Sequence, residues 1–174
     1  IVSKLSSGIA QMAKARNVET LCGLASFASN SELKVKTDKG EKSVTFEKCI
    51  IAVGSKSAMI PGVPGDHPSI LTSRTALDLE ETPESLLIIG GGVIGLELGQ
   101  VYAALGSKVS LVEFLPDLLP GTDPDLVKPL RRKLKDQFKS IRVSSKVTQI
   151  EPKDDMTLNI TIETDGKRAV EAFH

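Results

Sequence analysis

The sequence predicts an α/β protein in which a parallel sheet with flanking helices is joined to an antiparallel meander. The first observation is a buried-strand pattern at 86–89 that runs through a glycine-rich turn into a helical pattern, with a second apolar strand at 108–112. Such a strand–helix–strand unit pairs its strands in parallel. The second observation is the alternation of apolar and polar residues at 33–37 and 43–46, on either side of an Asp-Lys-Gly turn. That pattern is typical of antiparallel strands.

The composition is that of a folded globular chain with no net electrostatic bias. Of 174 residues, 40% are hydrophobic and 25% charged, and 22 basic residues balance 22 acidic ones. Because binding to nucleic acid depends on clustered positive charge, no nucleic-acid partner is expected. The basic residues at 131–135 fall in the later turns of a predicted helix, where cations complement the helix dipole. No apolar run is long enough to span a bilayer and nothing resembles a signal peptide, so no membrane partner is expected either.

The cysteines and histidines do not predict a metal site. Cys22 and Cys49 are too far apart in sequence for a CxxC motif, and the only histidines are His67 and His174. Both cysteines stand beside apolar strand residues, which predicts buried free thiols in a reducing compartment. We therefore expect a cytoplasmic protein.

The first part of the chain predicts a helix, a meander and one buried strand. The helix is expected to end at Asn17, and three short strands account for residues 18–46. The continuous apolar run Cys49–Val53 predicts a strand that is buried on both faces. The apolar residues of the helix recur at helical spacing at Ile1, Leu5, Ile9 and Met12.

Residues 59–83 predict a crossover between two domains. Prolines and glycines punctuate this stretch, which shows little periodicity, and both features are typical of interdomain segments. We place the boundary between Leu71 and Pro83 and divide the chain into residues 1–75 and 76–174. His67 falls within the crossover and is expected at the surface.

The second part predicts two helices and several strands. The helix after the glycine-rich turn is expected to end at Gly106, which permits a left-handed cap. Asp123 followed by Pro124 predicts the start of another helix, which runs to about Phe138. Further strands are expected near Val143, at 147–150, at 158–162 and around Val170. The predicted apolar face of the first of these helices consists of Ile94, Leu98, Val101 and Leu105.

The glycine-rich turn at residues 90–95 reads Gly-Gly-Gly-Val-Ile-Gly, which fits the pattern GxGxxG. Gly90 allows the tight turn off the strand, and Gly92 removes a β-carbon where a pyrophosphate approaches the backbone. Gly95 lets the helix pack closely on the sheet. The helix N-terminus offers unpaired N–H groups and a partial positive charge to the phosphates. The pattern therefore predicts a Rossmann-like dinucleotide-binding unit.

The alternative for a lone GxGxxG is a tight turn that binds nothing. Here the motif follows an apolar strand, opens a helix, and has an acid, Glu113, about twenty residues further on, as the dinucleotide fingerprint requires. A carboxylate accepts hydrogen bonds from both ribose hydroxyls and repels the 2′-phosphate of NADP. Residues 114–116 include no arginine to hold such a phosphate. The unit is therefore predicted to bind NAD(H) in preference to NADP(H).

Residues 87–99, together with Leu105-Gly106 and Val112-Glu113, resemble the dihydrolipoamide dehydrogenases, a family of flavin-dependent disulfide reductases. Cys49–Ser55 resembles the second FAD-domain signature of that family. The resemblance covers nearly the whole chain and implies an FAD/NAD(P)-binding fold. On this basis residues 1–75 are the later part of an FAD-binding domain, and the remainder is an NAD-binding domain truncated near its end.

The resemblance also implies which residues hold which cofactor. Glu113 would hold the adenosine ribose, and Val147 would pack against the adenine, a role compatible with an ordinary core position. Glu97 would contact the nicotinamide region, the alternative being a solvent-facing helix residue. The pyrophosphate and nicotinamide path would be lined by Gly90, Gly91, Gly92, Val93, Ile94, Gly95, Leu96 and Glu97. FAD would be contacted by Gly23, Val53, Gly54 and Ser55, with a main-chain contact at position 53, where the family often has threonine.

By the same resemblance, the chain contains no catalytic residue. The redox-active CxxxxC of the family precedes residue 1, and its catalytic His–Glu pair follows residue 174. The chain is therefore expected to be a fragment that is inactive by itself. We also expect that it does not retain FAD, because the first, pyrophosphate-binding βαβ unit of the FAD domain is missing.

The function implied is the NAD(H)-binding part of an enzyme in which hydride passes between FAD and NAD. The intact protein would be a homodimer associated with a 2-oxo-acid dehydrogenase complex. One alternative is another flavin disulfide reductase or a soluble transhydrogenase, because the deciding thiols lie outside the chain. An alternative of a different class is a non-catalytic NAD(H)-binding or sensor module, against which the flavin signature at Ala52–Ser55 argues.

Overall fold

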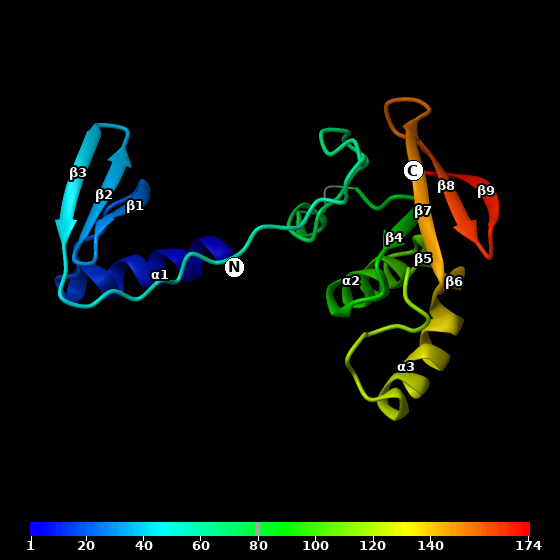
Figure 1. Ribbon diagram of the computed structural model, residues 1–174. Helices are drawn as coiled ribbons and strands as arrows, with labels where there is room; N and C mark the ends of the chain where they lie inside the picture. Colours follow the sequence, from blue (N-terminus) through cyan, green and yellow to red (C-terminus); the bar gives the residue numbers. More distant parts are fainter. Residues whose placement is uncertain (79–80) are drawn as a thin grey trace. The chain divides into compact units, whose positions relative to one another are not determined.

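The computed structural model describes residues 1–78 and 81–174, which form two compact units (Figure 1). The first unit is Ile1–Gly54 and the second is Ser55–His174. Within the described ranges, no helix combines the length and the apolar character needed to cross a membrane. The predicted division at residue 75 into an FAD-related and an NAD-related part stays a prediction.

The first unit consists of one helix and a three-stranded antiparallel meander (Figure 1). The strands pair in sequence order, with Leu33 on the middle strand opposite both Phe27 and Val44. The helix gives way to a turn at Asn17, whose positive φ of 54° is not helical. The predicted helix and meander are thus confirmed. Their bounds are α1 Val2–Ala15, β1 Leu24–Ser29, β2 Glu32–Thr37 and β3 Gly40–Thr45.

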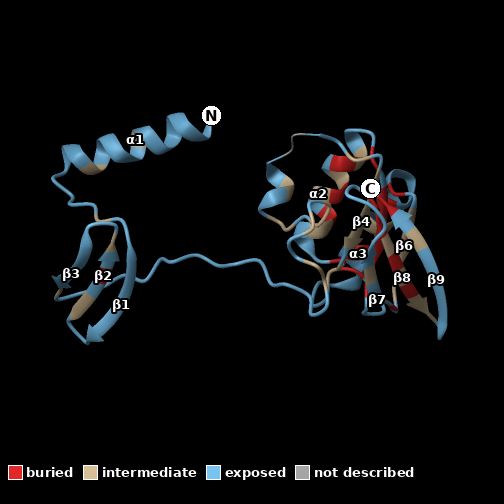
Figure 2. Cartoon of the chain, turned by 90° about the horizontal axis from the view of Figure 1, so that it is seen from above, coloured by how far each residue is buried: buried red, intermediate tan, exposed pale blue. Residues whose placement is uncertain are grey.

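Most residues of the first unit are exposed (Figure 2). Val35 on β2 is buried, whereas α1 contains no buried residue although its apolar positions recur at helical spacing. Phe27 and Phe46 pack edge to face with ring centroids 6.1 Å apart. The apolar side chains of this unit therefore bury little of one another's surface from solvent.

The buried strand predicted at Cys49–Val53 is wrong. The segment has irregular backbone, and Ile50 has 92% of its surface exposed. A strand buried on both faces needs neighbouring strands to satisfy its backbone groups, and no strand of the described chain pairs with this run. For the same reason Cys49 is an exposed thiol, and Cys22 is exposed as well, so the prediction of buried thiols is also wrong.

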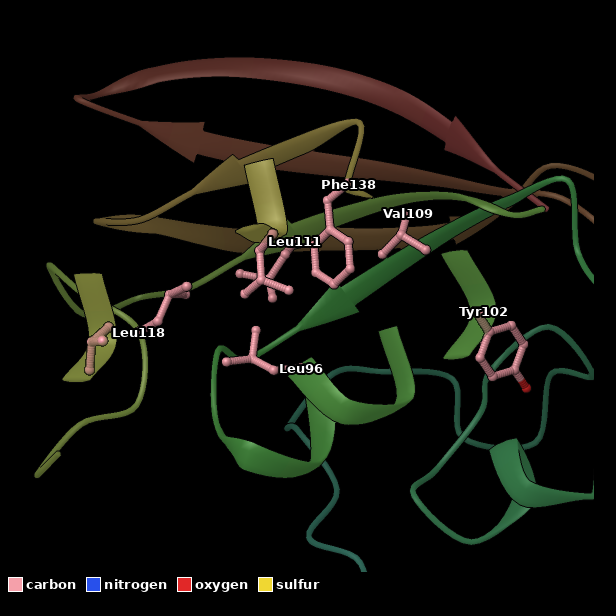
Figure 3. Packing of buried hydrophobic residues seen from close by; sticks show 8 residues of the cluster. Leu96, Tyr102, Val109, Leu111, Leu118 and Phe138 are labelled. Carbon is pink, nitrogen blue, oxygen red and sulfur yellow. The ribbon is translucent and has the colours of Figure 1, made fainter. Parts of the chain in front are cut away.

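The second unit has three layers, in which a central parallel sheet lies between two helices and an antiparallel sheet (Figure 1, Figure 3). The central strands have the order β4-β5-β6 and are parallel, whereas β7, β8 and β9 form a meander. This arrangement confirms the predicted α/β fold. The bounds are η1 Thr75–Leu77, β4 Ser85–Ile89, α2 Val93–Ala104, β5 Lys108–Val112, α3 Pro124–Gln137, β6 Ser140–Arg142, β7 Ser145–Pro152, β8 Leu158–Thr164 and β9 Lys167–Phe173.

The central strand β5 buries both of its faces, because successive side chains of a strand point to opposite sides of the sheet. Val109 and Leu111 pack on the helix side with residues of α2 and α3 (Figure 3). Val112 packs on the other side with Ile160 and Ile162 of the antiparallel sheet. This double burial explains the nearly continuous apolar pattern of the strand. It also fixes the position of Glu113, the residue that follows β5.

The helix α2 buries a different face from the one predicted. Its buried residues are Leu96, Gly99 and Tyr102. A β-carbon at position 99 would lie 2.5 Å from Cδ1 of Ile88 on β4, so the helix approaches the sheet through its glycines. Because apolar residues occur on more than one face of α2, spacing alone does not choose the face. The residues left exposed include Ile94, Val101 and Leu105.

The predicted helix ends of the second unit are confirmed. Gly106 follows the last turn of α2 with φ +107°, which suits a residue without a side chain. The Asp123 carboxylate accepts the N–H of Asp125 at 3.2 Å, and Pro124 occupies the first helical position of α3. Both signals act within a few residues, so the sequence contains all that they need.

One ion pair joins the two sheets of the second unit. Arg142 at the end of β6 donates to both carboxylate oxygens of Glu171 on β9, at 2.6 and 2.8 Å. This bidentate hydrogen bond holds the pKa of Glu171 below its ordinary value, against the opposing effect of partial burial.

Candidate nucleotide-binding site

The glycine-rich loop lies at the carboxyl edge of the parallel sheet, between β4 and α2. Gly90 has φ +108°, a left-handed conformation that favours glycine. Its N–H donates to the carbonyl of Val112 at 2.8 Å, and the carbonyl of Gly91 accepts the N–H of Leu119 at 2.9 Å. The loop is thereby held at the carboxyl end of β5, which is the edge where open parallel sheets bind ligands.

Two positions of the loop favour glycine for different reasons. A β-carbon at Gly95 would lie 2.6 Å from the carbonyl oxygen of Gly90 and 3.0 Å from Cγ2 of Ile88. The close packing of α2 on β4 therefore requires glycine there. A β-carbon at Gly92 would have no atom within 4 Å. Packing does not explain that glycine, whereas the approach of a ligand would.

Glu113 follows β5 directly and is 7% exposed. Its Oε2 accepts the N–H of Gly91 at 2.5 Å, and its Oε1 accepts the N–H of Leu115 at 2.6 Å. The carboxylate therefore anchors the glycine-rich loop to the end of β5. Because a carboxylate has about four acceptor positions, these two bonds leave capacity for hydroxyl groups of a ligand.

A cleft of about 320 Å³ opens beside the loop and brings together three predicted site residues. These are Gly90, Glu113 and Val147, which come from the ends of β4 and β5 and from β7. The N–H of Ser145 donates to the carbonyl of Glu113 at 2.9 Å, and this bond places the start of β7 against the end of β5. The cleft is also lined by residues 148–150, by Phe114 and by the segment 60–63.

The N-terminus of α2 is suited to an anion. The N-cap is Gly92, so no capping side chain satisfies the first backbone N–H groups. These groups, together with the helix dipole, attract negative charge. No acidic side chain occupies the first turn of the helix to compete with a ligand.

The other predicted residues of the loop and helix fall into two groups. Val93, Ile94 and Glu97 are exposed, so their side chains are accessible to a ligand. Leu96 is 2% exposed and packs in the core between α2 and β5, and Gly91 is buried as well. Leu96 could therefore contact a cofactor only through its main chain.

The residues predicted to contact FAD are distributed over the two compact units. Val53 and Gly54 end the first unit, Ser55 begins the second, and all three are exposed. Gly23 has a packing reason to be glycine, because a β-carbon there would lie 2.5 Å from the carbonyl oxygen of Lys36. A contact of these residues with FAD stays a prediction.

The segment 60–63 is the part of the cleft that sequence reasoning missed. The crossover was predicted only as a connection between two domains, yet Ile60, Pro61, Gly62 and Val63 line the cleft. The Pro-Gly pair does predict a turn, but no local signal shows where a turn lies in the folded unit. His67 was predicted at the surface, but it is half-buried, and its ring nitrogens make two hydrogen bonds.

Comparison with known proteins places this geometry in context. The chain matches the family described as pyridine nucleotide-disulphide oxidoreductase over residues 1–173. It is 40% identical over 169 residues to the dihydrolipoyl dehydrogenase of Vibrio parahaemolyticus, and 42% identical over 168 residues to that of Haemophilus influenzae. These alignments cover 97% and 96% of this chain, but 35% and 34% of the relatives. The chain thus spans about a third of the length of the curated relatives it matches.

Solved structures share the fold. LpdA from Mycobacterium tuberculosis matches with a TM-score of 0.83 at 21% identity, over 97% of this chain and 38% of that one. The HOCl-induced flavoprotein disulfide reductase RclA from Escherichia coli matches with a TM-score of 0.78 at 26% identity, over 95% of this chain and 37% of that one. At 21% identity the first likeness shows the fold alone.

Proposed function

Because the chain belongs to the pyridine nucleotide-disulphide oxidoreductase family, we propose that it is the NAD(H)-binding part of a dihydrolipoyl dehydrogenase. In the intact enzyme, hydride would pass between FAD and NAD, and the enzyme would act as a homodimer within a 2-oxo-acid dehydrogenase complex. The identity of about two residues in five to curated dihydrolipoyl dehydrogenases supports this assignment.

The observation that carries the proposal is the convergence of three residues in one cleft. Gly90, Glu113 and Val147 are far apart in the sequence, and each is predicted from a different part of the dinucleotide-binding pattern. A glycine turn that merely connects a strand to a helix would have no need of an acid and an apolar strand at the same opening. Their common location supports a nucleotide with its ribose at Glu113 and its adenine at Val147.

The residues present fit NAD. The open space at Gly92 and the uncapped start of α2 suit a pyrophosphate, which needs close approach to backbone N–H groups. Glu113 has acceptor capacity beyond its two internal bonds. When bound, NAD supplies the acceptor for a hydride. The contribution of this chain is to hold the phosphates, to fix the ribose and thereby to orient the reactive end.

Charge in the cleft supports a preference for NAD(H) over NADP(H). A 2′-phosphate at the ribose would meet the buried carboxylate of Glu113 and would lack a partner on it. Among the described residues that line the cleft, Lys146 is the cation, and its Nζ lies 2.9 Å from Oε1 of Glu163. In this ion pair the ammonium group of Lys146 is balanced by the carboxylate of Glu163 on β8, so the cleft offers little positive charge to a 2′-phosphate.

A second candidate is another flavin-dependent disulfide reductase, which the structural likeness to RclA favours. The cleft residues do not separate the two candidates, because both classes would use them in the same way. A protein that contains this chain and accepts dihydrolipoamide supports the first candidate. A protein that turns over other disulfides with NADH and ignores dihydrolipoamide supports the second.

The test of the NAD site is a fluorescence titration of the chain with NADH and with NADPH. We expect NADH to bind more tightly, and we expect Glu113→Gln or Glu113→Ala to abolish the preference by removing the repelling charge. Glu84→Gln is the matched control, because Glu84 is exposed and pairs with Lys108 at the opposite end of the parallel sheet. This variant should retain the preference.

Two outcomes would contradict the proposal. A folded wild-type chain that binds neither nucleotide would show that these residues do not make a working site. A wild-type preference for NADPH would refute the role assigned to Glu113. The fold is monitored through Tyr102, the single tyrosine in a chain without tryptophan, which lies in the core of the second unit.

A further inference from the structure

The crossover residues Ile60–Val63 form a wall of the nucleotide cleft that neither the motif nor the family resemblance assigns. We propose that this turn is the outer wall of the adenosine subsite, opposite β7, and that His67 and Ser69 are positioning residues that hold it there. The proposal rests on the NAD(H) site proposed above. It adds a determinant of nucleotide affinity that lies outside the dinucleotide-binding motif.

The wall is a rigid turn that the local sequence specifies. The N–H of Val63 donates to the carbonyl of Ile60 at 3.2 Å, and Gly62 has φ +83°. Proline at the second position and a left-handed glycine at the third are the features of a type II turn. Proline fixes its own φ, so Pro61 reduces the freedom of the turn before any ligand binds.

The same stretch continues as two further hydrogen-bonded turns. The N–H of His67 donates to the carbonyl of Pro64 at 3.0 Å, and the N–H of Ile70 donates to the carbonyl of His67 at 2.9 Å. Ile70 then packs against the core between the two sheets. The stretch 60–70 is therefore a series of hydrogen-bonded turns that ends in the core.

Two side chains attach these turns to the loop between β7 and β8. The Nε2 of His67 lies 3.3 Å from the carbonyl oxygen of Asp154, and the hydroxyl of Ser69 donates to the carbonyl of Met156 at 3.0 Å. The N–H of Ser69 donates to Nδ1 of His67 at 3.2 Å. Since Nδ1 accepts, a neutral ring carries its proton on Nε2 and donates it to Asp154. The crossover is thus attached to the sheet that forms the opposite wall.

The adenosine end of the nucleotide is the part that fits between these walls. The turn lines the cleft together with Glu113, the predicted ribose partner, and Val147, the predicted adenine partner. The lining described for the cleft includes no residue of α2, on which the predicted nicotinamide partner Glu97 lies. Apolar side chains on both sides suit the two faces of a flat base, because each face buried between them is removed from water.

The first test changes the conformational preference of the turn without a clash against any protein atom. No atom lies within 4 Å of a β-carbon built at Gly62, so Gly62→Ala acts through its φ of +83° and not through a clash. Alanine disfavours that conformation, and binding must restore it. We expect NADH affinity to fall about fivefold, the factor that corresponds to about 1 kcal/mol. Gly166→Ala is the matched control, because Gly166 has φ +73° and equal space but lies in the turn between β8 and β9.

The second test removes one attachment. Ser69→Ala is expected to weaken NADH binding about threefold, because the turn loses a hydrogen bond that holds it against β7–β8. Ser69→Thr keeps the hydroxyl and should bind as the wild type does. Ser107→Ala is the matched control, since Ser107 also donates to a crossover carbonyl, that of Pro83 at 2.6 Å, but at the other end of the segment.

Truncated ligands show whether the loss of affinity comes from contacts with the adenosine end of NADH. ADP-ribose affinity should fall in parallel with NADH affinity in Gly62→Ala and Ser69→Ala, whereas binding of reduced nicotinamide mononucleotide should not change. If the wild type binds NADH and both variants bind it as their controls do, this inference is overturned and the proposed function stands. If the loss is seen with reduced nicotinamide mononucleotide instead, the wall is assigned to the wrong end. A folded wild type that binds neither NADH nor ADP-ribose refutes the proposed function and this inference together.

Discussion

Gly92 and Gly95 offer a test that separates ligand binding from folding within a single loop. At Gly95 a β-carbon would meet the backbone oxygen of Gly90 at 2.6 Å, well inside the 3.4 Å at which ordinary contact begins. A backbone oxygen cannot swing aside as a flexible side chain can. Overpacking costs about 1–3 kcal/mol, and alanine recovers at most about 1 kcal/mol as the better helix former. We expect Gly95→Ala to lower the free energy of unfolding by about 1–2 kcal/mol.

At Gly92 the expectation is reversed. The backbone there has φ −77° and ψ 175°, which alanine adopts freely, and the space beyond the glycine is open. Glycine outranks alanine at an N-cap by no more than about 1 kcal/mol, so Gly92→Ala should change stability less than Gly95→Ala does. Its methyl group would stand where the pyrophosphate approaches, so NADH affinity should fall at least about tenfold.

Both variants are measured by urea unfolding, monitored through Tyr102, and by NADH titration of the folded state. Because Tyr102 is buried in the core of the second unit, its fluorescence reports on that unit. Wild-type affinity in Gly92→Ala would refute the idea that the open space serves a phosphate. Wild-type stability in Gly95→Ala would refute the close packing of α2 on β4.

Three further predictions concern the second unit. Glu171 has a pKa below its ordinary 4.5 because Arg142 holds its charged form, so its contribution to stability is present above that value and is lost as the pH falls through the folded pKa. Glu171→Gln should therefore make the unfolding free energy less dependent on pH below about pH 5, and an unchanged acid limb in urea titrations would contradict this. Asp123→Ala should lower the unfolding free energy by about 1 kcal/mol by removing the cap on the N–H of Asp125, whereas Asp123→Asn should keep most of it. Leu134→Ala should lower the free energy of unfolding by about 2–5 kcal/mol, because Leu134 is fully buried where α3 packs on the sheet. A urea midpoint close to that of the wild type would show that the core is not packed as described.

The features that local sequence could predict are those that local interactions decide. The cap at Asp123, the end of α2 at Gly106 and the turn off β4 at Gly90 each depend on a few neighbouring residues. The alternation along β2 and β3 likewise needs only a strand period of two. Glu113 could be singled out because the length of a strand–helix–strand unit sets the distance from the glycines to the end of the second strand.

Other predictions were wrong because they depended on partners elsewhere in the chain. The apolar run Cys49–Val53 has the composition of a buried strand, but composition does not supply the neighbouring strands that burial requires. The face of α2 was misassigned because apolar residues surround the helix, and the glycines that let it approach β4 decided its rotation.

The sequence by itself determined the order of helices and strands in the second unit, the conformation of its turns and the chemistry of its glycine-rich loop, because these follow from residues within about one turn or one strand of each other. Only the tertiary structure decided that Val147 and Glu113 line one cleft, that Oε2 of Glu113 also anchors the glycine-rich loop through Gly91, and that the turn at Ile60–Val63 lines the same cleft. Such contacts join segments separated by tens of residues. They arise from the pairing of β4 with β5 and from the packing of the two sheets, for which the sequence pattern contains no local signal.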